Sequence, residues 1–169
     1  MKRLTLVRHA KSDWKIAGLK DFDRPLSRRG LKEAPGMAQR LAEQKARVDL
    51  LITSPAVRAL ETARFFAKAL DYPLRQLKSE DRLYLARPAE ILDVIRGVGT
   101  RVQHLMIFGH NPGLSEFAQQ ITAEPALGEL PTCAVYSMEF EIDRWSEARF
   151  GAARNASLSQ PRNFLDLLS

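Results

Sequence analysis

The feature of this sequence that most constrains its fold is the alternation of short apolar runs with longer amphipathic segments. Residues 4–7, 50–53 and 104–108 are runs that are typical of short buried strands. Between them, residues 28–44 and 55–72 carry apolar side chains at helical spacing. Because strands that alternate with helices usually pair in parallel, this pattern predicts an α/β fold.

The remaining segments extend that prediction. Helices are expected at residues 88–96 and 114–121, an edge strand at 73–78, and a closing hairpin from residues 134–142 and 146–152. The tail from residue 155 has no regular pattern apart from an apolar stretch, residues 164–168, which we expect to pack on the body. The expected architecture is a three-layer α/β/α sandwich on a mainly parallel mixed sheet of about six strands.

The length of 169 residues fits a single domain, residues 1–169. The net charge of +6 favours anionic partners without selecting one class of anion. Its basic residues are spread along the chain, so we expect no nucleic-acid partner.

Three features predict a soluble cytoplasmic protein that has no membrane partner. The single cysteine, Cys133, excludes an internal disulfide and fits a reducing compartment. The apolar stretch near the N-terminus is too short for a signal peptide. Uninterrupted apolar runs in the chain fall short of the ~20 residues that span a bilayer.

Cationic and imidazole side chains follow the three predicted central strands. Arg8 and His9 come directly after the first, Arg58 lies just beyond the second, and His110 follows the third. Ligands of open parallel sheets bind outside the carboxyl ends of the strands. We therefore expect these four side chains to meet in one cavity.

This set of residues suits phosphoryl transfer, in which catalysis is chiefly positioning and electrostatic stabilisation. Arginine binds phosphate oxygens through a planar fork, and a neutral imidazole can attack phosphorus to give a covalent phosphoenzyme. With three histidines and no closely spaced His/Asp cluster, the sequence predicts neither a metal site nor a cofactor.

Two other phosphatase chemistries are disfavoured. Cys133 lacks the arginine that a cysteine phosphatase loop needs a few residues later. Asp21 and Asp23 resemble an aspartyl-phosphatase pair, but no buried strand precedes them.

Four segments resemble motifs of the histidine phosphatase (phosphoglycerate mutase-like) superfamily, in the order of that family. They are residues 6–10 (LVRHA), 23–30 (DRPLSRRG), 54–63 (SPAVRALETA) and 109–113 (GHNPG). The short length is most similar to SixA-type phosphohistidine phosphatases. One departure is Ala10, where the family usually has glycine, and we expect it to be tolerated if its φ is negative.

The resemblance implies roles for these residues. His9 would be the nucleophile, Arg8 and Arg58 would bind phosphate, and His110 would hydrogen-bond the transferring group. Ser12 and Asn111, which flank the motifs, are candidate substrate-binding residues, with a turn role as the alternative.

A proton donor is the least defined part of the resemblance. Aligning the family's acid segment on Glu80–Tyr84 puts Asp81 at the acid position. A phosphomonoester needs a proton for its leaving alkoxide, whereas imidazole is a better leaving group. A shortened acid therefore favours phosphohistidine as the substrate, and the short segment between Asp81 and His110 predicts an open, shallow pocket.

The sequence thus predicts a metal-independent phosphatase that hydrolyses phosphohistidine on a protein through a phospho-His9 intermediate. Two alternatives stay open: a phosphatase for a small phosphomonoester in the same pocket, and a non-catalytic module that binds phosphorylated partners. Mutase activity is a weaker rival, because it would need a second phosphate site and a closed pocket.

Overall fold

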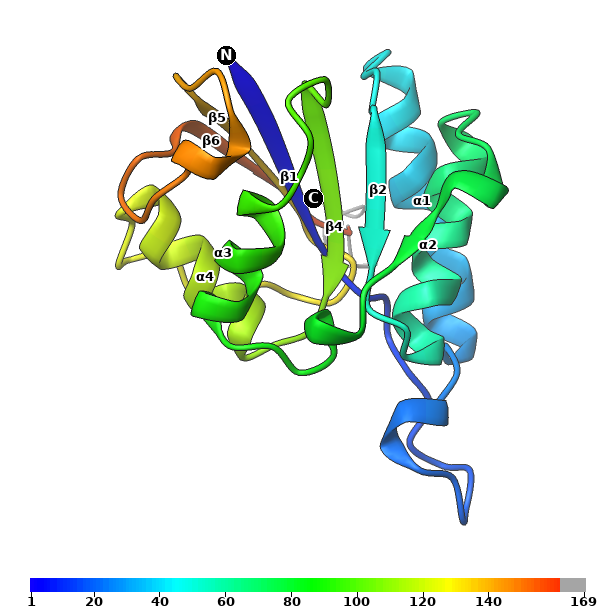
Figure 1. The fold of residues 1–169 in the computed structure, drawn as a ribbon. Helices are drawn as coiled ribbons and strands as arrows, with labels where there is room; N and C mark the ends of the chain where they lie inside the picture. Colours follow the sequence, from blue (N-terminus) through cyan, green and yellow to red (C-terminus); the bar gives the residue numbers. More distant parts are fainter. Residues whose placement is uncertain (162–169) are drawn as a thin grey trace, which may run out of the picture.

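The computed structural model describes residues 1–161, in which six strands form one mixed sheet with the order β3-β2-β4-β1-β5-β6 (Figure 1). The strands are β1 (Lys2–Arg8), β2 (Leu50–Thr53), β3 (Lys78–Ser79), β4 (His104–Gly109), β5 (Val135–Phe140) and β6 (Arg154–Ser159). Strands β1 to β4 pair in parallel, and β5 and β6 add antiparallel pairs at one edge.

Four α-helices cover the two faces of this sheet within the described residues. They are α1 (Arg28–Glu43), α2 (Val57–Ala69), α3 (Pro88–Arg96) and α4 (Gly113–Thr122). Side chains of a strand alternate between faces, so Leu6 joins the core under α3 and α4 while Val7 joins the core under α1 and α2. The predicted three-layer α/β/α sandwich is confirmed.

The long loop between β1 and α1, residues 9–27, is anchored at the start of α1. Ser27 caps this helix, and its Oγ accepts a hydrogen bond from the backbone N–H of Gly30 at 3.1 Å. The backbone N–H of Ser27 donates to the carbonyl of Lys11 at 2.8 Å. Gly30 packs so tightly on that carbonyl that a Cβ atom would collide with it. The two ends of the loop are therefore held together, and its middle projects from the body (Figure 1).

The prediction of a closing hairpin is correct for its first strand and wrong for its second. β5 forms, but the second stretch contains a 3₁₀ helix, Trp145–Glu147, in which buried Trp145 donates from Nε1 to the carbonyl of Val102 at 2.8 Å. The partner of β5 is β6, in the segment that we expected to be irregular. β6 is an exposed, mostly polar edge strand, so it lacks the apolar alternation that marks a strand in a sequence.

Two further expectations concern short elements. The predicted edge strand at 73–78 is mainly a 3₁₀ helix, Leu74–Gln76, and Lys78 is its one residue that belongs to β3 and pairs with β2. The apolar stretch 164–168 lies outside the described residues. No helix within residues 1–161 combines the length and apolarity needed to cross a bilayer.

Candidate active site

A cavity of about 220 Å³ lies where β1, β4 and the start of α2 meet. β1 ends at Arg8, so His9 begins the next loop, and β4 ends one residue before His110. Arg58 is the second residue of α2. The cavity is lined by Arg8, His9, Lys11, Ser12, Trp14, Asp21, Arg24, Arg58, Leu85, His110, Asn111 and Thr132. The structure thus brings the four side chains predicted at strand ends to one place.

His9 is held with one ring nitrogen, Nε2, unprotonated. Its Nδ1 lies 2.7 Å from the carbonyl oxygen of Ala10. A carbonyl can only accept, so Nδ1 carries the proton and donates it. Nε2 therefore has a lone pair, and it accepts a hydrogen bond from Nε of Arg58 at 3.4 Å.

Ala10 fits the position where the family usually has glycine. Its backbone is not among the residues with positive φ, and its side chain is fully buried in the core under α1 and α2. Its N–H donates to Oγ1 of Thr62 at 3.0 Å. Ala10 is accommodated without left-handed backbone strain.

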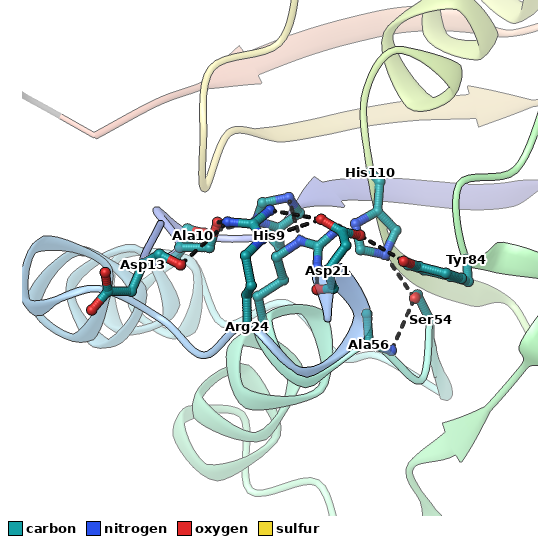
Figure 2. Close-up of polar contacts among 11 residues, drawn as sticks. His9, Ala10, Asp13, Asp21, Arg24, Ser54, Ala56, Tyr84 and His110 are labelled. Atoms are coloured by element: carbon teal, nitrogen blue, oxygen red, sulfur yellow. Dashed lines mark hydrogen bonds and ion pairs between the residues drawn. The ribbon is translucent and has the colours of Figure 1, made fainter. Parts of the chain in front are cut away.

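His110 lies beside His9, with ring centroids 5.1 Å apart. Its Nε2 is 2.7 Å from Oγ of Ser54, and this oxygen accepts a hydrogen bond from the N–H of Ala56 at 3.2 Å (Figure 2). Nδ1 of His110 is buried and has no hydrogen-bond partner among residues 1–161. Because an unpaired buried polar atom is costly, this atom marks a place that a ligand would satisfy.

Both imidazole rings are neutral near pH 7. Burial lowers the pKa of His9 to about 3, and the nearby charges of Arg58 and Arg8 act in the same direction. Burial also lowers the pKa of His110 to about 3, with added contributions from His9 and Arg58. A neutral His9 needs no base to become a nucleophile.

The two arginines line the cavity from different elements. Nη1 of Arg8 donates to the carbonyl of Leu130 at 2.8 Å, while its buried Nε has no partner in the part of the chain that the structure describes. Arg58 is buried and donates from Nη1 to the carbonyl of Asp21 at 2.7 Å. From Nη2 it donates to Oδ2 of Asp21 at 3.0 Å.

Asp21, which the sequence analysis set aside, is the carboxylate that reaches the cavity. It lies on a 3₁₀ helix, Asp21–Asp23, in the projecting loop. Its Oδ2 also accepts from the hydroxyl of Tyr84 at 2.6 Å, and its Oδ1 accepts from Nε of Arg24 at 3.1 Å (Figure 2). No buried strand precedes Asp21, but the loop folds back and brings it to the strand ends.

Asp21 is ionised throughout the physiological range. Burial alone would raise its pKa, but the hydrogen bond from Tyr84 and the charge of Arg58 outweigh burial and lower the pKa to about 2. Arg24 contributes in the same direction. The cavity therefore contains a fixed negative charge among its cations.

Ser12 and Asn111, the predicted substrate-binding residues that flank the motifs, both line the cavity but make different contacts. Ser12 lines the cavity, and its Oγ accepts from Nη1 of Arg24 at 2.6 Å. Asn111 also lines the cavity, but its amide is used within its own loop. Its Oδ1 accepts from the N–H and hydroxyl of Ser115 at 3.2 and 2.6 Å, and its Nδ2 donates to the carbonyl of Leu130 at 2.8 Å. This pattern fits the turn role for Asn111.

Asp81 does not join the cluster. It is exposed at the start of a 3₁₀ helix, Asp81–Leu83, and is not among the residues that line the cavity. Its neighbour Glu80 is engaged by Arg82 through a hydrogen bond of 3.0 Å. From this segment, Tyr84 is the residue that extends to Asp21.

Among residues 1–161, no group of three or more His, Cys, Asp or Glu side chains is arranged to hold a metal ion.

Comparison with known proteins identifies the family. The model of the histidine phosphatase superfamily (branch 1) matches residues 4–83. An uncharacterised protein of Mycobacterium tuberculosis is 30% identical over 165 residues, which cover 92% of this chain and all of that protein. The chain belongs to the histidine phosphatase superfamily. The segment shared with the superfamily model contains Arg8, His9 and Arg58.

Solved structures place this histidine phosphatase superfamily member beside SixA proteins. A candidate phosphohistidine phosphatase SixA of Agrobacterium tumefaciens has a TM-score of 0.81 at 28% identity, covering 95% of this chain and 98% of that chain. The protein histidine phosphatase SixA in complex with tungstate has a TM-score of 0.77 at 18% identity, with coverage of 98% and 99%. The resemblance to the SixA type, inferred from the motifs, is confirmed.

A shorter match connects the chain to mutases. The 2,3-bisphosphoglycerate-dependent phosphoglycerate mutase of Gloeothece citriformis is 46% identical over 67 residues, which cover 37% of this chain and 28% of the mutase. The identity over this segment supports the resemblance to phosphoglycerate mutase-like proteins, although the match covers only part of each chain.

Proposed function

We propose that this protein is a metal-independent phosphatase that hydrolyses phosphohistidine on a protein through a phospho-His9 intermediate. The observation that carries the proposal is the unprotonated Nε2 of His9, whose lone pair accepts a hydrogen bond of 3.4 Å from Nε of Arg58 in a cavity that also contains His110. The cytoplasmic location stays a prediction from the sequence.

The phosphoryl group would be bound by donors that lack partners in the free protein. Ser54 accepts from Ala56 and has its own hydroxyl proton, which it donates to Nε2 of His110. We assign the hydroxyl proton of Ser54 to this bond, and the assignment puts the proton of His110 on Nδ1, the buried atom that has no partner among residues 1–161. Together with Nε of Arg8, it would donate to phosphoryl oxygens as charge develops on them.

In the first step the lone pair of His9 Nε2 forms a bond to phosphorus. The substrate ring enters protonated on its other nitrogen; the bond from phosphorus to the leaving nitrogen breaks, its electron pair goes to that nitrogen, and the ring leaves as neutral imidazole. His9 enters neutral with its proton on Nδ1 and becomes a phosphorylated imidazolium ring. The carbonyl of Ala10 accepts that Nδ1–H at 2.7 Å and stabilises the positive charge.

In the second step water attacks phosphorus, and the bond from phosphorus to Nε2 breaks. Its electron pair returns to Nε2, so His9 becomes neutral again without any transfer of the Nδ1 proton. The proton that the water loses ends on the released phosphate. The hydrolysis step therefore needs no acid for the ring that leaves.

Within residues 1–161, neither of the two carboxylates considered as acids, Asp81 and Asp21, can serve the cavity, and this favours phosphohistidine over a phosphomonoester. Asp81 is exposed and does not line the cavity. Asp21 does, but with a pKa of about 2 it has no proton to donate near pH 7. An alkoxide leaving group needs such a proton, whereas a phosphorylated imidazole that is protonated on its other nitrogen leaves as neutral imidazole without one.

The cavity rim favours a protein as the carrier of the phosphoryl group. Trp14 and Leu85 line the cavity and are 71% and 54% exposed. Exposed apolar side chains beside a polar site are typical of a surface that contacts another protein. A small phosphorylated metabolite would leave both side chains largely in water.

A substrate comparison tests the proposal against its two alternatives. We expect a higher kcat/KM for a phosphohistidine protein and for phosphoimidazole than for sugar phosphates or p-nitrophenyl phosphate. Faster turnover of the monoesters would support the small-molecule phosphatase instead. Binding of phosphorylated protein without turnover of any substrate would support the non-catalytic module.

A further inference from the structure

The carboxylate of Asp21 is an unexpected group in a cavity built for an anion. It lines the same cavity as Arg8, His9 and His110, and it is ionised near pH 7. A fixed negative charge within a few ångströms of a phosphoryl group opposes phosphate binding. A favourable interaction of the Asp21 carboxylate with the substrate would therefore be needed to offset this repulsion.

The carboxylate has room for one more donor. Oδ2 accepts hydrogen bonds from Arg58 and Tyr84. Within the described residues Oδ1 contacts Arg24 alone, accepting one hydrogen bond from Nε and forming an ion pair with Nη2, both at 3.1 Å. A carboxylate offers about four acceptor positions, so at least one remains. The Asp21 side chain is also 41% exposed, which leaves it accessible to a substrate.

The position of Asp21 relative to His9 is set by Arg58. The Nε atom of this guanidinium group faces His9, and its two terminal nitrogens face Asp21. Arg58 therefore spans the space from the nucleophile to the carboxylate. A phosphoryl group bound along Arg58 would have His9 on one side and Asp21 on the other.

We propose that Asp21 accepts a hydrogen bond from the free ring N–H of the substrate's phosphorylated imidazole, and so selects phosphohistidine over phosphomonoesters. The inference rests on the proposed function and assigns a substrate-recognition role to a residue of the loop. In this role Asp21 contacts the leaving group, whereas Arg8, Arg58 and His110 contact the phosphoryl oxygens.

The chemistry of the leaving group explains the preference. A phosphorylated imidazole with a proton on its second nitrogen is a cation, and a nearby carboxylate stabilises that protonated form. When the bond from phosphorus to nitrogen breaks, the electron pair goes to that nitrogen and the ring leaves as neutral imidazole, keeping its N–H. A phosphomonoester leaves as an alkoxide, which the charge of Asp21 repels and which Asp21 cannot protonate.

The test compares Asp21→Asn with Asp23→Asn on two probes, phosphoimidazole and p-nitrophenyl phosphate. Asp23 is a matched control, because it lies on the same 3₁₀ helix, is exposed and does not line the cavity. In Asp21→Asn we expect kcat/KM for phosphoimidazole to fall by about tenfold, the scale of a hydrogen bond to a charged group. For p-nitrophenyl phosphate it should stay the same or rise, because the repulsion is lost. Asp23→Asn should change neither value.

The outcomes separate this inference from the proposed function. An equal fall for both probes would mean that Asp21 only orients Arg58, and an equal rise would mean that it only obstructs the cavity; either result overturns the inference. The proposed function itself fails if the unaltered protein prefers p-nitrophenyl phosphate, whatever the variants do.

Tyr84→Phe gives a second readout if Asp21→Asn does not fold. It removes one donor to Oδ2 but keeps the carboxylate charge, so the preference for phosphoimidazole should persist. Loss of that preference in Tyr84→Phe would contradict the inference.

Discussion

The floor of the cavity and the loop beside it are built in different ways. The floor residues His9, Arg58 and His110 follow or adjoin buried strands and are each at most 7% exposed. The part of the loop after His9 contributes Trp14, which is 71% exposed, and Asp21, whose side chain is 41% exposed. The floor is fixed by the packing of the core, whereas the loop is fixed by polar contacts among its own residues and with the floor.

This difference separates two tasks. Burial keeps the two imidazole rings neutral, and neutrality is what nucleophilic attack requires. The loop carries charge and apolar surface where a substrate enters. We infer that the floor performs phosphoryl transfer on any bound phosphoryl group, and that the loop decides which carrier is accepted. Changes in the floor should therefore affect all substrates alike, and changes in the loop should discriminate between them.

The largest effect is expected for His9→Gln. Removing the nucleophile should lower kcat by ~10³-fold or more with every substrate, as for other covalent catalysts. Steady-state assays with phosphoimidazole and p-nitrophenyl phosphate measure it, with thermal unfolding as the check on folding. Residual activity above a tenth of the original with either probe would mean that His9 is not the nucleophile.

Arg58→Lys should give the next largest loss, again with both probes. Lysine keeps the positive charge but cannot present two aligned donors. We expect kcat/KM to fall by about 10²-fold, the scale of a lost oxyanion donor. A loss confined to one probe would contradict the division between floor and loop.

Trp14→Ala should have a smaller and selective effect. Trp14 stacks on Arg24, with the guanidinium carbon 3.3 Å from the ring centroid, and is otherwise exposed at the rim. We expect kcat/KM to fall by about fivefold for a phosphohistidine protein and to stay unchanged for phosphoimidazole, because only the protein reaches the rim. Equal losses for the two substrates would place Trp14 in the floor rather than in a docking surface.

Asp81→Asn should change kcat/KM by less than about twofold with either probe, as for an exposed carboxylate that makes no substrate contact. A strong loss with a sugar phosphate, whose alkoxide leaving group needs a proton, would restore Asp81 as the acid and favour the phosphomonoester alternative. Asp93→Asn, an exposed carboxylate on α3, serves as the control.

The histidine rings of the floor should show no titration near their usual pKa of about 6.5. Their pKa values are lowered to about 3, so protons bind only when the pH falls close to that value. NMR of ¹³C-labelled histidine in the free protein, followed from pH 8 to 5, should report neutral rings throughout. A titration step between pH 6 and 7 for His9 would contradict the effect assigned to burial.

The floor could be predicted from the sequence and most of the loop could not. Arg8, His9 and His110 directly follow apolar runs, and the topology of parallel strands brings such positions to one edge. Asp21 and Arg24 lie in a segment without periodicity, and their roles depend on a fold-back that local sequence does not encode. The signal that could have found them is their position in the loop that leaves the same strand as His9.

Two other differences have similar causes. Asp81 was expected at the site from motif alignment, but a 3₁₀ turn directs it to the surface and leaves Tyr84 to reach Asp21. β6 was missed because its residues are mostly polar and exposed, so pairing with β5 decides its structure rather than any pattern of its own.

The most direct test of the account is to trap the phosphoenzyme. The protein would react briefly with labelled phosphoimidazole, and the quenched adduct would be exposed to acid and to alkali. We predict an adduct that is labile to acid, stable to alkali, absent from His9→Gln and present in Asp23→Asn. An adduct with the opposite stability, or one that persists in His9→Gln, would contradict phosphoryl transfer through His9.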